Sequence, residues 1–170
     1  MVEVKMSSNI RNFKAGGDNL FRIAEKIIED DDTCKLLYYT DTDPLSQPNL
    51  TEDQRLGLLH KNILLVPKVP ENDDIKGSYI LVLYDGFSQN LANPQFKDAD
   101  LLFIIVCPPE NWVINDVSLR PFMLMSKIDE LFGNKKISNI GTLQFVKGDR
   151  FVLNSQLTGY GLTYSTYEFS

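Results

Sequence analysis

The chain has 170 residues, of which 43% are hydrophobic and 11% aromatic, and its 17 basic and 23 acidic side chains give a net charge of −6. This length favours one domain, and the apolar content is sufficient for a core, which excludes global disorder. The acidic balance argues against a protein that mainly neutralises nucleic-acid phosphates, because that task needs a basic footprint. We expect a single domain over residues 1–170, with a flexible N-terminal arm over residues 1–17.

The first third of the chain is predicted to be helical. Apolar residues recur at helical spacing from Asp18, the expected N-cap, to Glu29, after a break at Gly16-Gly17. A run of carboxylates then precedes a second short helix over residues 33–39, because carboxylates stabilise the N-terminus of a helix and destabilise its C-terminus. A capping-box pattern predicts a third helix over residues 51–60.

Strands are predicted from the middle of the chain onward. Short apolar runs cover residues 62–66, 79–85 and 101–106, and each is bounded by proline, glycine or acidic residues. Residues 86–97 are polar and connect the second run to the third, which suits a hairpin-type link of unusual length.

The last third combines one helix with further strands. Ser118 is the expected N-cap of a strongly amphipathic helix over residues 119–132, with Gly133 at the C′ position. Strands are expected over residues 140–147 and 150–153, around a turn at Gly148-Asp149. A final strand over residues 160–169 shifts its alternation near Ser165-Thr166, which predicts a bulge there.

This order of elements predicts the fold class. The strands follow one another through hairpin-like links, and a single helix crosses the set. We therefore expect an α+β fold: a mostly antiparallel sheet packed by an N-terminal helix and one long helix at about residues 118–132.

The charge is unevenly distributed along the chain. Residues 29–100 hold six basic and fourteen acidic side chains, whereas residues 101–170 hold six of each. Acidic loop residues can serve solubility alone, or they can form one negative face. The candidates for such a face are Asp30, Asp31, Asp32, Asp73 and Asp74.

Targeting and redox signals are negative. The N-terminus lacks the apolar core of a signal peptide, and no apolar run approaches the ~20 residues that span a membrane. Cys34 and Cys107 lie far apart without a metal-binding spacing, so we expect reduced thiols packed as small apolar residues. These features predict a protein made inside a cell.

No pattern of catalytic residues stands out. His60 is the only histidine, which argues against a His-based triad or a two-histidine zinc site. Carboxylates at or near strand ends can hold magnesium for phosphodiester cleavage, and the candidates are Asp41, Asp43, Asp85, Asp98 and Asp100. Turn formation explains Asp41 and Asp43 equally well. We expect a non-enzymatic protein without cofactors, and a metal-dependent nuclease is the alternative.

Aromatic residues suggest an interface. The chain holds seven Tyr and ten Phe, and such residues serve both sheet packing and subunit contacts. The final strand, or residues 79–85, could extend the sheet of a neighbouring subunit edge to edge. The candidate interface residues are Tyr160, Tyr164, Tyr167 and Phe169.

The order of strand, helix, strand and long final strand, ending in GYGLTYSTYEF, resembles the tail terminator and related neck or tail-completion proteins of tailed bacteriophages. The segments DPLSQPNL, KNILLVPKVP and SLRPFMLMSKIDELFG share this similarity, which spans residues 18–169. The resemblance implies a small α+β subunit without catalytic residues that forms a ring, usually a hexamer, on the tail tube. The helices between residues 33 and 60 are additional to the minimal set of elements in that family. A head-completion or connector-ring subunit is therefore the alternative within this hypothesis.

The same resemblance implies the partners and the location. The ring would contact further copies of the chain, tail tube or sheath proteins and a head-side connector, and DNA would pass through it without specific binding. An acidic lumen or axial face suits such a passage, because carboxylates repel phosphates. The implied location is the virion, assembled in the cytoplasm of a bacterial host, without membrane contact.

Overall fold

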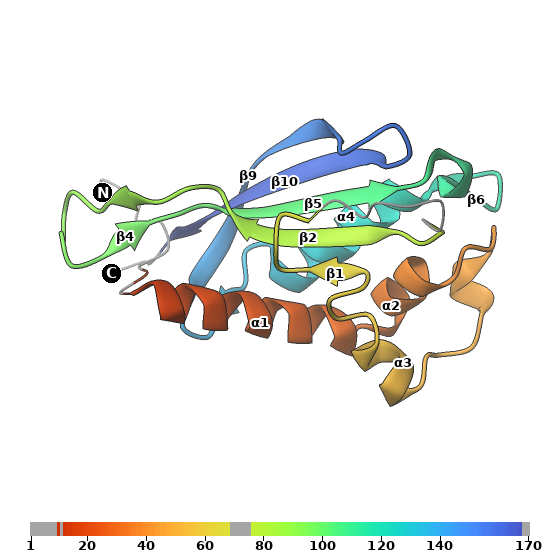
Figure 1. Ribbon diagram of the computed structural model, residues 1–170, viewed down its shortest axis with the longest axis horizontal. Helices are drawn as coiled ribbons and strands as arrows, with labels where there is room; N and C mark the ends of the chain where they lie inside the picture. Colours follow the sequence, from red (N-terminus) through yellow and green to blue (C-terminus); the bar gives the residue numbers. More distant parts are fainter. Residues whose placement is uncertain (1–9, 11, 69–75, 168–170) are drawn as a thin grey trace.

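A computed structural model describes residue 10 and residues 12–68 and 76–167. Its main feature is one curled six-stranded sheet with the order β1-β2-β5-β10-β9-β8 (Figure 1). Every neighbouring pair is antiparallel except β1 and β2. The strands are β1 (Ile63–Leu64), β2 (Tyr79–Tyr84), β5 (Leu101–Cys107), β8 (Lys136–Ile137), β9 (Gly141–Val152) and β10 (Thr158–Tyr167).

Helices and two small hairpins complete the fold. The helices are α1 (Phe13–Glu29), α2 (Asp31–Tyr38), α3 (Glu52–Leu56) and α4 (Arg120–Phe132), with the 3₁₀ turns η1 (Pro44–Ser46) and η2 (Pro109–Asn111). The hairpins pair β3 (Ser88–Gln89) with β4 (Lys97–Asp98), and β6 (Val113–Ile114) with β7 (Ser118–Leu119). The predicted α+β class, with a mostly antiparallel sheet, an N-terminal helix and one long helix, is confirmed.

The main core lies between the helices and one face of the sheet. α1 packs against β2, and α4 packs against β5 and β10. The ring of Phe103 stacks on Phe132 with a centroid distance of 5.2 Å and meets Tyr164 edge-on at 5.7 Å. A smaller apolar cluster that includes Leu81 and Ile104 occupies the opposite face, because alternate side chains of a strand point to opposite sides.

α1 begins earlier than the sequence predicts. Its N-cap is Asn12, whose side chain accepts a hydrogen bond from the N–H of Ala15 at 2.8 Å. The expected cap at Asp18 and break at Gly16-Gly17 are therefore wrong, and residues 13–17 are helical instead of part of an arm. The helix tolerates two glycines, each about 1 kcal/mol unfavourable, because tertiary packing of the apolar stripe provides most of the stability of a helix.

The next two helices form at the predicted places, although α2 begins two residues before the expected Thr33. Asp30 caps α2 by accepting hydrogen bonds from the N–H and the hydroxyl of Thr33, at 2.8 and 2.7 Å. Thr51 and Gln54 form the expected capping box at the start of α3. α3 is shorter than expected and ends at Leu56, and His60 lies beyond it with a positive φ of 64°.

Both ends of α4 differ from the prediction in detail. Ser118 belongs to β7, and Leu119 occupies the N-cap position without a side-chain hydrogen bond. Gly133 ends the helix with an ordinary φ of −62°, and Asn134 is the residue with positive φ, at 54°. Glycine suits position 133 because a Cβ there would lie 2.4 Å from Oδ1 of Asp129.

The end of the chain forms a longer hairpin than predicted. β9 runs unbroken through Gly148-Asp149, so the expected turn there is wrong, and the chain reverses between β9 and β10 instead. The side chain of Asn154 stabilises that reversal by accepting hydrogen bonds from two N–H groups. The predicted irregularity lies at the step from Thr163 to Tyr164, next to Ser165, and the extra residue is Val146 of β9 on the partner strand.

A buried arginine connects α4 to the end of α2 and to η2. Arg120 is 1% exposed, and its guanidinium donates to four main-chain carbonyls at 2.7 to 2.8 Å. Those carbonyls belong to Leu36, Tyr39, Asp41 and Asn111. Within the described ranges, no ion pair involves this arginine. Burial therefore lowers its pKa, and the carbonyl dipoles replace the hydration of its charge.

Replacing Arg120 should destabilise the whole domain. We expect Arg120→Met to lower the free energy of unfolding by about 3 kcal/mol or more, because four carbonyls lose a charged donor in a buried site. Urea denaturation followed by circular dichroism measures this change. Arg150→Met, at an exposed position of β9, is the matched control and should change stability by less than about 0.5 kcal/mol. Equal stabilities would contradict the structural role of Arg120.

Two glycines of β10 make a second matched pair. A Cβ at Gly159 would lie 1.8 Å from the carbonyl oxygen of Ile105, whereas a Cβ at Gly161 would meet Leu102 at an ordinary 3.5 Å. We therefore expect Gly159→Ala to cost about 3 kcal/mol or more of stability and Gly161→Ala about 1 kcal/mol or less. Urea denaturation of both variants tests the close approach of β5 and β10, and equal losses would contradict it.

Candidate subunit interface

The exposed edge of the sheet belongs to β9. β8 pairs only with Gly141 and Thr142, so from Gln144 to Val152 no second strand of the described chain pairs with β9. The expectation that the final strand provides a free edge is wrong, because β10 lies between β5 and β9. Among the described residues a second, shorter edge remains on β2, because β1 pairs only with Ile80 and Leu81.

An apolar groove lies beside this edge, between α4 and the β9–β10 ladder. It has a volume of about 340 Å³, and a second hollow of about 370 Å³ continues from it along α4. Phe122 and Ser126 line both hollows. Phe122 is 46% exposed and Phe145 is 54% exposed. We call this surface the α4–β9 groove and define it by Phe122, Met125, Ser126, Asp129, Asn134, Phe145, Leu162 and Tyr164.

β9 also has features that limit strand addition. The bulge at Val146 interrupts the regular ladder, and the exposed Lys147 pairs with Asp149 at 2.9 Å. Bulges and charges on an edge hinder the pairing of a further strand. A partner of this surface is therefore expected to bind mainly through side chains in the α4–β9 groove.

The predicted interface tyrosines lie in different environments. Tyr160 is partly buried, and its ring meets Phe122 at a centroid distance of 5.1 Å. Tyr164 is fully buried and donates a hydrogen bond to Asp129 at 2.8 Å; burial is the main reason that its pKa is raised. Tyr164 is thus a core residue and offers no exposed interface surface. Tyr167 ends β10, and Phe169 lies outside the described residues.

Sequence reasoning did not find the two aromatic rings that are most exposed at this groove. Phe122 was expected on the apolar stripe of α4, and Phe145 on an ordinary packed strand. Helical periodicity identifies an apolar stripe but not its width, and a stripe wider than the contact with the sheet leaves residues at its border exposed. The exposure of an aromatic side chain at such a border becomes visible only in the three-dimensional structure.

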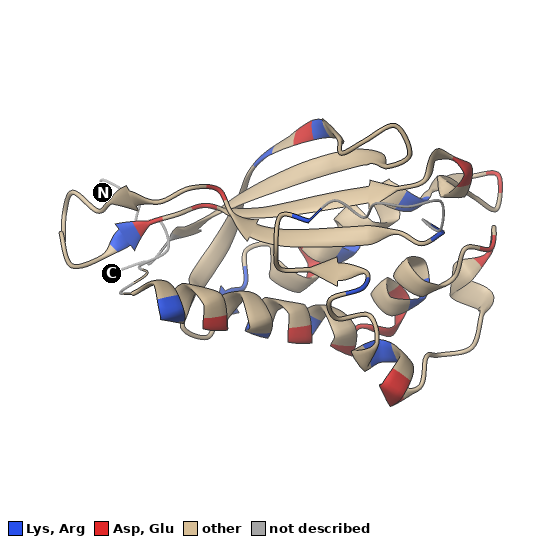
Figure 2. Ribbon diagram, viewed as in Figure 1, with Lys and Arg blue, Asp and Glu red and all other residues tan. Residues whose placement is uncertain are grey.

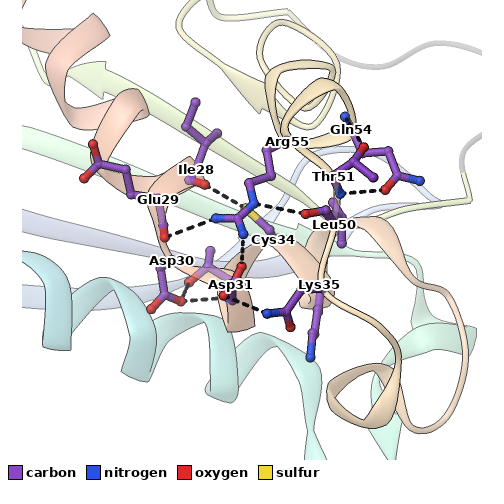
Figure 3. Close-up of polar contacts among 12 residues, drawn as sticks. Ile28, Glu29, Asp30, Asp31, Cys34, Lys35, Leu50, Thr51, Gln54 and Arg55 are labelled. Atoms are coloured by element: carbon purple, nitrogen blue, oxygen red, sulfur yellow. Dashed lines mark hydrogen bonds and ion pairs between the residues drawn. The ribbon is translucent and has the colours of Figure 1, made fainter.

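The predicted acidic face is engaged in contacts within the subunit (Figure 3). Asp30 caps α2. Asp31 accepts a hydrogen bond from Asn49 at 3.0 Å and forms an ion pair with Arg55. Arg55 also donates to the carbonyls of Glu29 and Leu50, so this arginine joins the start of α3 to the corner between α1 and α2.

The remaining acidic candidates are divided between the corner and an undescribed segment. Asp32 pairs with Lys127 of α4 at 2.9 Å, and the hydrogen bond that Lys127 donates to Asp32 is the main cause that raises the pKa of this lysine. Asp73 and Asp74 lie outside the described residues. The carboxylates of the corner therefore hold α1, α2, α3 and α4 together, and their exposure to a lumen stays a prediction.

The candidate carboxylates Asp41 and Asp43 do not lie together with Asp85. Asp43 accepts hydrogen bonds from Ser46 and Asn115, which lower its pKa, and the carbonyl of Asp41 belongs to the Arg120 contacts. Asp85 follows β2 at the opposite end of the sheet (Figure 2). Among the described residues, no group of three or more His, Cys, Asp or Glu side chains is arranged to hold a metal ion.

Three carboxylates do line one cavity, at the base of the β3–β4 hairpin. Asp85, Asp98 and Asp100 border a hollow of about 460 Å³. Asp98 accepts a hydrogen bond from Asn90 at 2.8 Å, and Asp100 accepts one from Ser165. These contacts position the hairpin relative to the sheet and leave its base negatively charged.

The comparisons with known proteins identify a family. A family model described as YomW matches residues 30–166. The chain belongs to the YomW family. No curated protein matches the chain. In this YomW-family chain, the match includes the β3–β4 hairpin, α4 and β9, and none of the described helices is long and apolar enough to span a membrane.

Both cysteines should be unreactive in the folded protein. Burial raises the pKa of Cys34 to about 12 and that of Cys107 to about 11, and both thiols are fully buried. Since the thiolate is the reactive form, we expect no reaction with a thiol-specific disulfide reagent at pH 8 under native conditions. Both thiols should react at once in denaturant. Rapid labelling of either cysteine in the native protein would contradict this assignment.

Proposed function

We propose that this chain is a non-enzymatic structural subunit that assembles with further copies of itself into a ring. The observation that carries the proposal is the α4–β9 groove, where half-exposed Phe122 and Phe145 lie beside a strand edge without a partner strand among the described residues. Clustered exposed aromatic side chains are characteristic of protein–protein interfaces.

The resemblance in element order suggests in which biological assembly this ring would function. As a neck protein of a tailed bacteriophage, the ring caps the tail tube, joins tail to head and resides in the virion. Six copies are the expected number for such a ring. The confirmed order of β5, α4, β9 and β10 supports the resemblance without deciding between a tail-side and a head-side position.

The charge of the chain suits a ring that surrounds DNA. A net charge of −6 disfavours adhesion to phosphates, so DNA passes through the lumen without specific binding. In this proposal the acidic corner at Asp30, Asp31 and Asp32 lies toward the lumen or an axial face. Its carboxylates have contacts inside the subunit, so its repulsion of DNA is weaker than the number of acids alone suggests.

Assembly of the purified full-length chain tests the proposal. We expect native mass spectrometry and negative-stain imaging to show closed rings at micromolar concentration. Phe145→Glu should weaken the subunit contact by on the order of 30-fold, which corresponds to the ~2 kcal/mol of an aromatic interface residue.

The controls separate assembly from folding. Phe21→Glu replaces a phenylalanine of α1 with similar exposure, 49%, and should leave the rings intact. Circular dichroism should show that both variants are folded, and Phe122→Glu provides a second groove variant if Phe145→Glu is unstable. A wild-type chain that stays monomeric at these concentrations would overturn the proposal.

A further inference from the structure

A segment on the outside of the helix corner has few attachments to the core. Residues 47–61 connect η1 to β1, include α3 and lie beside the end of α1 (Figure 1). The buried residues of this fully described segment are Leu50 and Leu58, which enter the main core, and α3 has none. Among the described residues, its hydrogen bonds from main chain to main chain reach only residues 44–63. We call residues 47–61 the strap.

One arginine connects the strap to the corner between α1 and α2. The Arg55 guanidinium pairs with Asp31 and donates to the carbonyl of Glu29 at 3.5 Å (Figure 3). The two side chains of the ion pair are 27% and 40% exposed, so solvent and salt weaken it. Neutral side chains, among them Asn49 and Tyr39, add hydrogen bonds at 3.0 and 3.1 Å. Ionic strength therefore acts directly on one attachment of the strap.

Two buried thiols distinguish the strap from the sheet. Cys34 belongs to α2, and its thiol donates to the carbonyl of Ile28 at 3.3 Å. In Figure 3 the Arg55 guanidinium lies over this thiol. Burial raises the pKa of Cys34 to about 12, and Arg55 is the charged group that most opposes this rise. Cys107 belongs to β5, between β2 and β10. Opening of the strap alone should therefore expose the first thiol and leave the second buried.

From these contacts we propose that the strap opens as a unit while the sheet stays folded, and that the Arg55–Asp31 ion pair is the clasp that holds it closed. Segments with few buried apolar side chains and local hydrogen bonds open at a lower free energy than the whole domain. The Debye length falls from about 10 Å at 0.1 M salt to about 3 Å at 1 M. A rise in ionic strength therefore weakens the clasp and exposes the core around Leu50 and Leu58. The strap is a salt-sensitive cover of that core, independent of ring assembly.

Thiol labelling in urea below the global unfolding transition tests the inference. With mass spectrometry of the labelled peptides, we expect Cys34 to react at least on the order of tenfold faster than Cys107 in the wild type. The Cys34 rate should also depend less steeply on urea, since opening of the strap exposes less surface than unfolding. Arg55→Met should increase the Cys34 rate on the order of tenfold. The control Lys14→Met, which removes the exposed ion pair with Asp18 of α1, should leave it unchanged.

Salt separates the clasp from the other contacts of the strap. About 1 M NaCl should raise the Cys34 rate more in the wild type than in Arg55→Met, which has no clasp left to screen. Equal rates and equal urea dependence of the two thiols would show that strap and sheet open together and would overturn the inference. A Cys34 rate that neither Arg55→Met nor salt changes would overturn the role of the clasp. The wild-type comparison decides the first point even if the variant does not fold.

Discussion

The buried guanidinium of Arg120 is the constraint on which the arrangement of the helices depends. It is almost fully removed from solvent and donates to the carbonyls of two separate segments, residues 36–41 and Asn111. Two of those carbonyls, of Leu36 and Tyr39, belong to the C-terminal end of α2, where the helix dipole favours a positive charge. A lysine would supply a single ammonium group in place of this planar fork, so the geometry is specific to arginine.

Because Arg120 is the first residue of α4, this contact also determines where the α4–β9 groove lies. Leu124 and Ile128 of α4 enter the core, and the helix direction fixed at Arg120 leaves Phe122 and Met125 along the border with β9 and β10. At the other side of the corner, Lys127 of the same helix pairs with Asp32. One helix thus connects the acidic corner, the core and the exposed groove.

Features that depend on neighbouring residues in the sequence could be predicted, and features that depend on distant packing could not. The capping box at Thr51 and the helix corner at Asp30 were found because each is complete within a few residues. The start of α1 was misplaced because Asn12 and Asp18 are equally good N-caps in isolation. For the site, alternation placed Tyr160 and Tyr164 on one face, but only the fold shows that α4 covers the latter, where Asp129 accepts its hydrogen bond. No local signal indicated that β9 continues past Gly148 or that the hairpin exposes Leu91.

The structure also divides the excess negative charge of residues 29–100 into two groups with different roles. The carboxylates of Asp31 and Asp32 are paired with Arg55 and Lys127, so their charge is largely neutralised within the subunit. Asp85 lies near Lys147 and contributes, after Asp149, to the raised pKa of that lysine, and Asp98 and Asp100 accept hydrogen bonds from the neutral side chains of Asn90 and Ser165. The first group stabilises the helix corner, and the second holds the base of the β3–β4 hairpin against the sheet.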